Sequence, residues 1–184
     1  MRTLLAILLA SLPAAAQVPG GHVYFGVGGS WMVPLASDSG HVWKSAQQSF
    51  APSLTLAHET QHTLVALDLE YGGFSGWPDY GIASLRGGWI FGSGSTAPYL
   101  ALGAGIMHMN AESHFDCVNG SCDVASGSGG AVLAEAGVLF FRHLRVGRVA
   151  LSVRAIEPLF GIKVSYQPQT DTLPLLLFTL RILG

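Results

Sequence analysis

Charged side chains in the middle of apolar segments are the first candidates for chemistry in this sequence. Each lies on the side of its segment opposite the large apolar residues, among alanine, glycine and serine. Five are mid-segment and the sixth, an arginine, lies near the chain's end; the six are Asp68, Glu70, Arg86, Glu135, Arg154 and Arg181. Carboxylates and guanidinium groups satisfy one another in ion pairs, so we expect an interior charge network. For Arg86, the expected partner is Asp68 or Glu70. A proton or small-ion path along the same residues is the alternative interpretation.

Two cysteines, Cys117 and Cys122, lie close together in the third long polar segment, with an Asn-Gly pair between them. Asn-Gly favours a chain reversal, and two close cysteines in an exported chain favour a disulfide. We therefore expect a Cys117–Cys122 disulfide in an external loop. The alternative is a metal site that adds His114 and Asp116 as ligands. We expect no metal and no other cofactor.

The seven histidines are scattered, and most of them fall in expected loops or at strand ends. One group contains the residue types of a serine hydrolase: His108, Glu112, Ser113 and His114. Its spacing matches no nucleophile motif, so we expect no catalytic residues and no enzymatic activity.

The segments that carry the charged residues alternate between large apolar and small residues. In the segment 97–109, Leu100, Leu102, Ala104 and Ile106 share one face, and small residues occupy most of the other. A period of two indicates a strand. A strand with one apolar face and one uncharged face of small residues fits the wall of a narrow barrel in lipid. The same pattern predicts strands over about 22–33, 50–58, 63–71, 80–91, 129–141, 149–155 and 172–183.

The connections between these eight strands alternate between long and short. In an antiparallel barrel this alternation puts the short turns and both termini at one end. Closure also removes the strand edges that lipid does not tolerate. Pro52 is expected near a strand end or a bulge, because proline cannot donate to the ladder. The expected fold is all-β: an eight-stranded antiparallel up-and-down transmembrane β-barrel.

Composition supports a single exported domain. Of the 184 residues, 49% are hydrophobic and 11% are charged, against a usual charged share of roughly a quarter. The net charge is -2 and the basic residues form no run, which disfavours nucleic acid as a partner. Residues 1–16 have the basic start, short apolar run and Ala14–Ala16 cleavage pattern of a signal peptide; a retained anchor is the alternative. We expect a mature barrel domain over 17–184.

Two stretches carry a resemblance to a known class: YFGVGG at Tyr24–Gly29 and APYLALGAG at Ala97–Gly105. Together with the signal peptide, they resemble small bacterial outer-membrane β-barrel proteins of the OmpA/OmpX-like class. The resemblance covers nearly all of the mature chain. It implies a monomer surrounded by outer-membrane lipid in a Gram-negative bacterium. Such barrels commonly end in an aromatic residue used in assembly, whereas this chain ends Arg181-Ile182-Leu183-Gly184.

The expected function is non-enzymatic, either structural or in surface interaction with an extracellular or envelope partner through the external loops. Two alternatives come from other classes. One is an outer-membrane enzyme that modifies lipid A. The other is a secreted lipocalin-like barrel, for which Gly29-Ser30-Trp31 resembles the Gly-x-Trp of a lipocalin first strand.

Overall fold

The alternating segments form ten strands in this computed structural model, which describes residues 21–35, 49–72, 79–118, 121–144, 146–163, 170–171 and 174–184. Two of the strands are short: β8 (Ile162–Lys163) and β9 (Thr170–Asp171). The eight long strands are β1 (Gly21–Pro34), β2 (Ser49–Thr60), β3 (Thr63–Gly72), β4 (Asp79–Ile90), β5 (Ala97–Val118), β6 (Ser121–Phe140), β7 (Arg148–Pro158) and β10 (Leu175–Leu183). Within the described ranges, no helix is long and apolar enough to cross a membrane.

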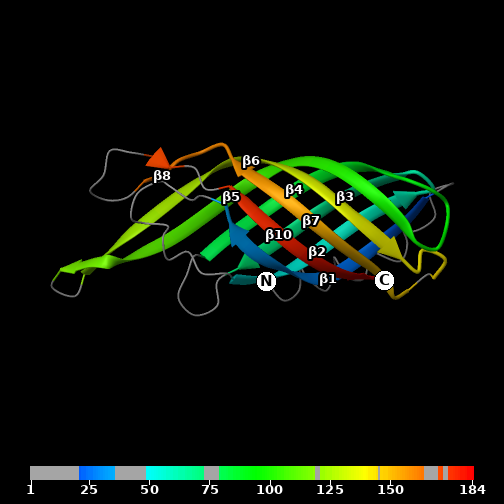
Figure 1. Cartoon of the computed structure of the whole chain (residues 1–184), viewed down its shortest axis with the longest axis horizontal. Coiled ribbons are helices and arrows are strands. Elements are labelled where there is room, and N and C mark those ends of the chain that lie inside the picture. Colours follow the sequence, from blue (N-terminus) through cyan, green and yellow to red (C-terminus); the bar gives the residue numbers. More distant parts are fainter. Residues whose placement is uncertain are drawn as a thin grey trace, which may run out of the picture.

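The eight long strands close into one antiparallel barrel. Their order is β5-β4-β3-β2-β1-β10-β7-β6, and an additional pairing of β5 with β6 completes the ring. The first and last strands pair from Gly26 with Leu183 to Pro34 with Leu175. Figure 1 shows the tilted strands running around the barrel. The expected eight-stranded up-and-down barrel is therefore confirmed.

The short connections meet at one end of the barrel, here called the turn end. They are residues 61–62, 91–96 and 141–147, between the strands that they join. β1 begins and β10 ends there, where Phe25 and Gly184 exchange two backbone hydrogen bonds of 3.0 and 2.8 Å. The opposite end, here called the loop end, carries the other connections. The alternation of long and short connections thus places both chain ends of the barrel at the turn end, as expected.

The third long connection differs from the expectation. We expected a loop over Asn110–Ser128, but β5 continues to Val118 and β6 begins at Ser121. The β4 partner strand stops at Asp79, which pairs with Asn110, so beyond that level β5 and β6 extend as a two-stranded hairpin (Figure 1). We call residues 111–118 and 121–125 the β5–β6 ribbon. Outside the barrel wall, neither face needs to be apolar, so the alternation that marks the other strands is missing here.

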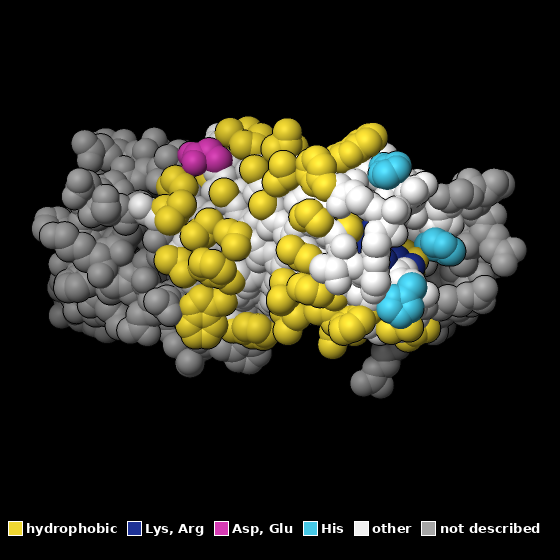
Figure 2. Space-filling model, turned by 45° about the vertical axis from the view of Figure 1, so that its right-hand side comes forward, with side chains coloured by type: hydrophobic (Ala, Val, Ile, Leu, Met, Phe, Trp, Pro, Cys, Tyr) yellow, Lys and Arg dark blue, Asp and Glu magenta, His cyan; other side chains and the backbone are white. Residues whose placement is uncertain are grey.

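The outward face of the barrel is a belt of exposed apolar side chains. Leu102 and Ile106 are each 71% exposed, and leucine and valine cover most of the outward positions of the other strands. Figure 2 shows the hydrophobic side chains gathered across the middle of the wall, with histidines beyond them towards one end. Exposed aromatic residues lie near both borders of the belt: Trp31, Phe50 and Tyr71 towards the loop end, and Trp89, Phe91 and Phe141 towards the turn end.

Smaller differences concern the strand limits. β7 extends to Pro158 rather than to about Ala155, and β10 begins at Leu175 rather than at about Thr172. Pro52 lies inside β2 and pairs with Gly29 of β1. The pairing of β2 with β3 begins one residue later, at Ser53. Pro52 therefore lies just beyond the end of the β2–β3 ladder, where its missing N–H group interrupts no bond to β3.

Candidate functional site

The inward side chains form three layers along the barrel axis. An apolar cluster fills the loop end; it contains Met32, Tyr80, Met107, Leu133, Ile156 and Leu175 among others. A second apolar cluster fills the turn end; it contains Tyr24, Leu64, Ile90, Tyr99, Leu139 and Leu183 among others. Between the two along each strand lie the inward polar residues, including all six charged residues that the sequence singled out. We call those six the central charge layer.

The central charge layer holds three acidic and three basic side chains, each at most 4% exposed. Arg86 Nε lies 2.5 Å from Asp68 Oδ2, and Arg86 NH1 lies 3.2 Å from Glu135 Oε2. Arg154 reaches all three acids, at 2.9 Å from Glu70, 3.1 Å from Glu135 and 3.7 Å from Asp68. Arg181 also reaches all three, at 3.0 Å from Glu135, 3.5 Å from Asp68 and 3.7 Å from Glu70. The structure thus brings the six residues into one network.

Each carboxylate in this layer also accepts a hydrogen bond from a hydroxyl group. Thr55 donates to Asp68 at 2.6 Å, Tyr99 to Glu135 at 2.5 Å and Ser30 to Glu70 at 3.2 Å. Buried charges are tolerated when they are paired and hydrogen-bonded; among the described residues, the Oε2 atom of Glu70 is the carboxylate oxygen of this layer that accepts no hydrogen bond. The layer is electrically balanced, since three carboxylates face three guanidinium groups.

Glycine provides the space for the largest inward side chains. Arg181 pairs in register with Gly28, Arg86 with Gly103 and Tyr99 with Gly137. A Cβ atom at Gly28 would lie 2.9 Å from Arg181 Cγ, and one at Gly103 would lie 2.8 Å from Arg86 Cβ. In each pair, the large side chain therefore lies over the backbone of the glycine on the adjacent strand. This explains why the inward face combines glycine with arginine and tyrosine.

This arrangement stabilises a closed interior rather than lining an open passage. Arg154 and Arg181 are fully buried, and Tyr80 and Tyr99 close the interior on either side of them. An eight-stranded barrel has an interior just wide enough for side chains to fill it. The described interior supplies no cysteine. Ser30 and Thr55 donate to carboxylates, Ser30 also bonds with Thr179, and the Ser53 and Ser84 hydroxyls have no hydrogen-bond partner among the described residues, so none of these hydroxyls contacts a histidine base.

A second polar cluster, which the sequence did not single out, lies at the turn end. Glu59 pairs with two arginines, Arg142 at 2.7 Å and Arg148 at 2.9 Å. Arg142 also donates to the backbone oxygens of Gly92, Thr60 and Gln61 at 3.0–3.3 Å. The Arg142 side chain of the β6–β7 turn thereby contacts both the β2–β3 turn and the β4–β5 turn.

Arg148 completes the turn-end cluster. Its guanidinium carbon lies 4.1 Å from the centre of the Tyr24 ring, within the range of a cation–π contact. Its Nε donates to the Leu144 backbone oxygen at 2.8 Å. In the sequence these residues form only a short basic connection, and the signal that identifies the cluster is the inward position of Glu59 near the end of an alternating strand.

Of the hydrolase-like group, only the side chain of His108 lies within the described part of the structure, because those of Glu112, Ser113 and His114 lie outside it. His108 Nδ1 lies 2.6 Å from the Oγ of Ser128 on β6, a residue that the sequence did not single out.

The side chains of Cys117 and Cys122 lie outside the described part of the structure, as do those of His114 and Asp116. The disulfide and the alternative metal site therefore remain predictions. Elsewhere in the described residues, no group of three or more histidine, cysteine or acidic side chains is placed to hold a metal ion. The expected signal peptide, residues 1–16, also lies outside the described residues.

Comparison with known proteins supports the fold. No family model and no curated protein matches this sequence. The Neisserial surface protein A structure is similar with a TM-score of 0.56 and 15% identity, covering 89% of this chain and 98% of that chain. Ail, the attachment invasion locus protein of Yersinia pestis, has a TM-score of 0.54 and 15% identity, covering 89% of this chain and 97% of that one. The chain therefore has the fold of small eight-stranded outer-membrane β-barrels.

Proposed function

We propose that this protein is a non-enzymatic outer-membrane β-barrel of a Gram-negative bacterium and that it acts through its loop end, by surface interaction. The observation that carries the proposal is the β5–β6 ribbon. β5 and β6 remain paired beyond the level of Asp79, the first residue of β4, with Ala111 opposite Ala125 and Ser113 opposite Asp123. A paired ribbon beyond the wall contributes nothing to closing the barrel, and loops held by a rigid scaffold are where binding residues concentrate.

The exposed belt supports the membrane location. In water, leucine, valine and aromatic side chains exposed around a whole wall would form a patch far larger than soluble monomers carry. In lipid the same face lies against hydrocarbon, and aromatic girdles lie at the interfaces. A lipocalin-like secreted barrel needs the reverse arrangement, with a polar exterior and a ligand cavity inside. Trp31 of the Gly-x-Trp sequence is 46% exposed on the outer wall, which disfavours that alternative.

The filled interior supports a role other than transport or catalysis. The central charge layer and two apolar clusters occupy the barrel from end to end. The Ail structure contains a heparin analogue, sucrose octasulfate. That ligand is a property of Ail, and at 15% identity it provides only a reason to include heparin among the surfaces tested here.

The test shortens the ribbon without opening the barrel. Asn110 and Ser126 are paired across β5 and β6, so replacing residues 111–125 by Asn-Gly gives a two-residue hairpin loop with a favoured turn sequence. Bacteria that display the full chain or this variant are compared for attachment to epithelial monolayers, to immobilised heparin and to one another. We expect the variant to reach the surface as a folded barrel and attachment to fall to the level of cells without the protein.

The control deletes Gly94, an exposed residue of the β4–β5 turn at the opposite end. It changes a connection of the barrel and leaves the ribbon intact, so attachment should remain at the level of the full chain. Equal attachment by the full chain, the shortened variant and cells without the protein would overturn the surface-interaction role.

A further inference from the structure

Three buried oxygen atoms on one side of the barrel interior have no hydrogen-bond partner among the described residues. They are Ser53 Oγ on β2, Glu70 Oε2 on β3 and the Tyr80 hydroxyl oxygen on β4. Each of these residues is at most 4% exposed. A buried polar group without a partner destabilises the folded state. Three such groups on neighbouring strands therefore call for a common explanation.

The three groups converge on one place. Ser53 and Glu70 lie directly opposite each other in the β2–β3 ladder. Tyr80 pairs with Gly72, two residues beyond Glu70 on β3. A Cβ atom at Gly72 would lie 2.6 Å from Tyr80 Cε1 and 2.9 Å from Ala51 Cβ, so the tyrosine ring crosses β3 towards β2. Among charged side chains, Glu70 has the largest electrostatic effect on the Tyr80 hydroxyl, as expected for groups that lie close together.

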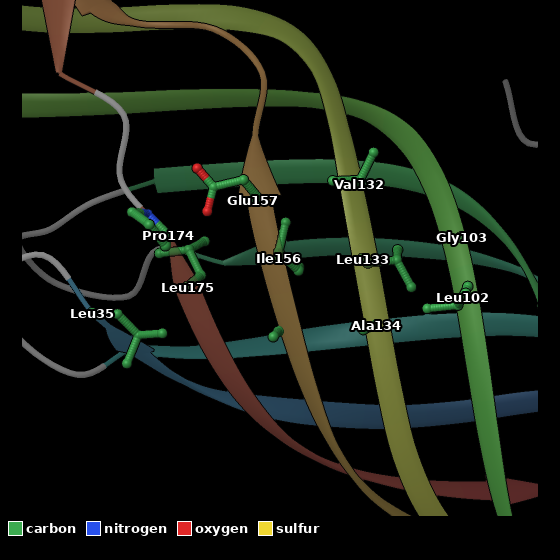
Figure 3. A pocket seen from close by; sticks show the side chains of 11 residues that line it. Leu35, Leu102, Gly103, Val132, Leu133, Ala134, Ile156, Glu157, Pro174 and Leu175 are labelled. Atoms are coloured by element: carbon green, nitrogen blue, oxygen red, sulfur yellow. The ribbon is translucent and has the colours of Figure 1, made fainter.

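The surroundings of this place are apolar on one side and already paired on the other. The Tyr80 ring belongs to the loop-end apolar cluster. Three other members of that cluster lie in register across β6, β7 and β10 and have no polar side-chain atom: Leu133, Ile156 and Leu175 (Figure 3). Towards the central charge layer, Glu70 Oε1 accepts from Arg154 NH1 at 2.9 Å. The Oε2 atom is thus the Glu70 oxygen that remains available to a partner from outside the chain.

We propose that Ser53, Glu70 and Tyr80 bind one ordered water molecule, between the central charge layer and the loop-end apolar cluster. The ligand must both donate and accept, because the site combines a carboxylate oxygen with two hydroxyl groups. A water molecule donates to Glu70 Oε2, accepts from the Tyr80 hydroxyl and bonds with Ser53 Oγ, which gives the usual total of about three bonds for a buried water. A metal cation cannot accept from a hydroxyl, and the charge layer is already balanced without one. The inference is independent of what the β5–β6 ribbon binds.

The direct test is a pair of crystal structures, of the refolded full chain and of Tyr80→Phe, at a resolution that shows ordered water. In the unaltered chain, we expect one water oxygen within about 2.5–3.0 Å of all three side-chain atoms. In Tyr80→Phe, this water should be displaced or lost. A direct hydrogen bond between two of the three side chains, with no water between them, would overturn the proposal.

Urea unfolding in detergent tests the same contact by the sign of its effect. Tyr80→Phe takes one bond from the water, so the unfolding midpoint should fall by roughly 0.3–1 M. If the hydroxyl had no partner, its removal would leave the midpoint unchanged or raise it, and the proposal would fail. Tyr24→Phe is the matched control, because it removes a buried hydroxyl that also has no described partner but lies in the turn-end apolar cluster. This control should not lower the midpoint; an equal fall in both variants would overturn the assignment to this site.

Two further measurements identify the ligand. Ser53→Ala should also lower the midpoint, and the double variant with Tyr80→Phe should lose less than the two single losses added together, because both changes act on one water. Strictly additive losses would contradict a shared ligand. The unaltered chain should unfold at the same midpoint in sodium chloride and in choline chloride of equal concentration, whereas a higher midpoint in sodium chloride would assign a cation instead. Unchanged heat-modifiable migration shows that each variant is folded.

Discussion

Arg86 illustrates what one buried guanidinium contributes to the barrel. Its two contacts, to Asp68 at 2.5 Å and to Glu135 at 3.2 Å, are both buried. Arg86→Met leaves one carboxylate in excess, and breaking a buried pair in this way costs about 3–5 kcal/mol. We expect a lower free energy of unfolding in urea titrations of the refolded protein.

The double variant Arg86→Met with Asp68→Asn provides the control, because it restores charge balance and keeps the volume of Asp68. It should recover part of the lost stability. If Arg86→Met unfolds at the same urea concentration as the unaltered protein, the central charge layer does not act as a network.

The glycines opposite large side chains give a second prediction at this scale. A Cβ at Gly103 would lie 2.5 Å from the backbone oxygen of Leu85, whereas a Cβ at Gly87 would meet nothing within 4 Å. Gly103→Ala should therefore destabilise the barrel by about 1–3 kcal/mol, the usual cost of overpacking. Gly87→Ala is the matched control and should be neutral or slightly stabilising. Thermal unfolding of the two variants in the same detergent measures the difference.

At the residue scale, the period of two was sufficient to place all six charged residues inside the barrel. It also restricted the partners of Arg86 to two acids on a neighbouring strand, and the structure has Asp68. The contact of Arg86 with Glu135 was beyond sequence reasoning, because it crosses β5 at Gly103. Contacts across the interior depend on the stagger and tilt of the whole barrel, which alternation does not report.

Among the elements, the three short turns depend on one another through Arg142. Arg142→Met removes its bond to Glu59 and three bonds to backbone oxygens of other turns. Hydrogen bonds from a charged donor contribute about 1.5–3 kcal/mol, and we expect a loss of that order. Amide hydrogen exchange should become faster in residues 60–63 and 91–96, and remain unchanged at the loop end.

Arg142→Lys separates charge from geometry. A lysine keeps the positive charge near Glu59 but lacks the planar fork that reaches several acceptors. Arg142→Lys should restore the ion pair with Glu59, but amide hydrogen exchange in the turns should still be faster than in the unaltered protein. Turns that exchange at the same rate in Arg142→Met and the unaltered protein would mean that the backbone bonds do not hold them.

The ribbon carries the prediction of the disulfide. β5 and β6 pair at Val118 and Ser121, so Cys117 and Cys122 flank the tip of the ribbon on adjacent strands. If the loop end faces the outside of the cell, they lie beyond cytosolic reductants. A membrane-impermeant maleimide should label intact cells weakly before reduction and strongly after it. Strong labelling without reductant would rule out the disulfide, and no labelling after reduction would contradict an exposed ribbon tip.

At the element scale, sequence patterns predicted the eight wall strands and missed the ribbon and the turn cluster for related reasons. The wall strands separate two environments, which the alternation records. The β5–β6 ribbon does not separate two environments, so residues such as Glu112, Ser113 and Asp116 gave no periodic signal. Arg142 follows a strand rather than lying within it, and its role depends on three turns meeting in space.

For the molecule as a whole, the filled interior predicts that it does not conduct ions. Planar bilayers containing the refolded barrel should show no single-channel steps in salt solutions at neutral pH. The same preparation should migrate faster on gels before boiling than after it, which controls for folding. Regular channel openings that disappear with Arg154→Met would instead favour an ion path along the central charge layer.

The strands that contribute residues to the central charge layer bear on how the barrel is completed. The six residues come from β3, β4, β6, β7 and β10, and Arg181 belongs to the last strand of the chain. A sheet of β1–β7 without β10 holds two arginines against three carboxylates and is still open between β1 and β7. When β10 pairs with both of these strands, it closes the wall and brings Arg181 to the three carboxylates. The last strand therefore supplies the missing counter-charge in the same step that buries the charge layer.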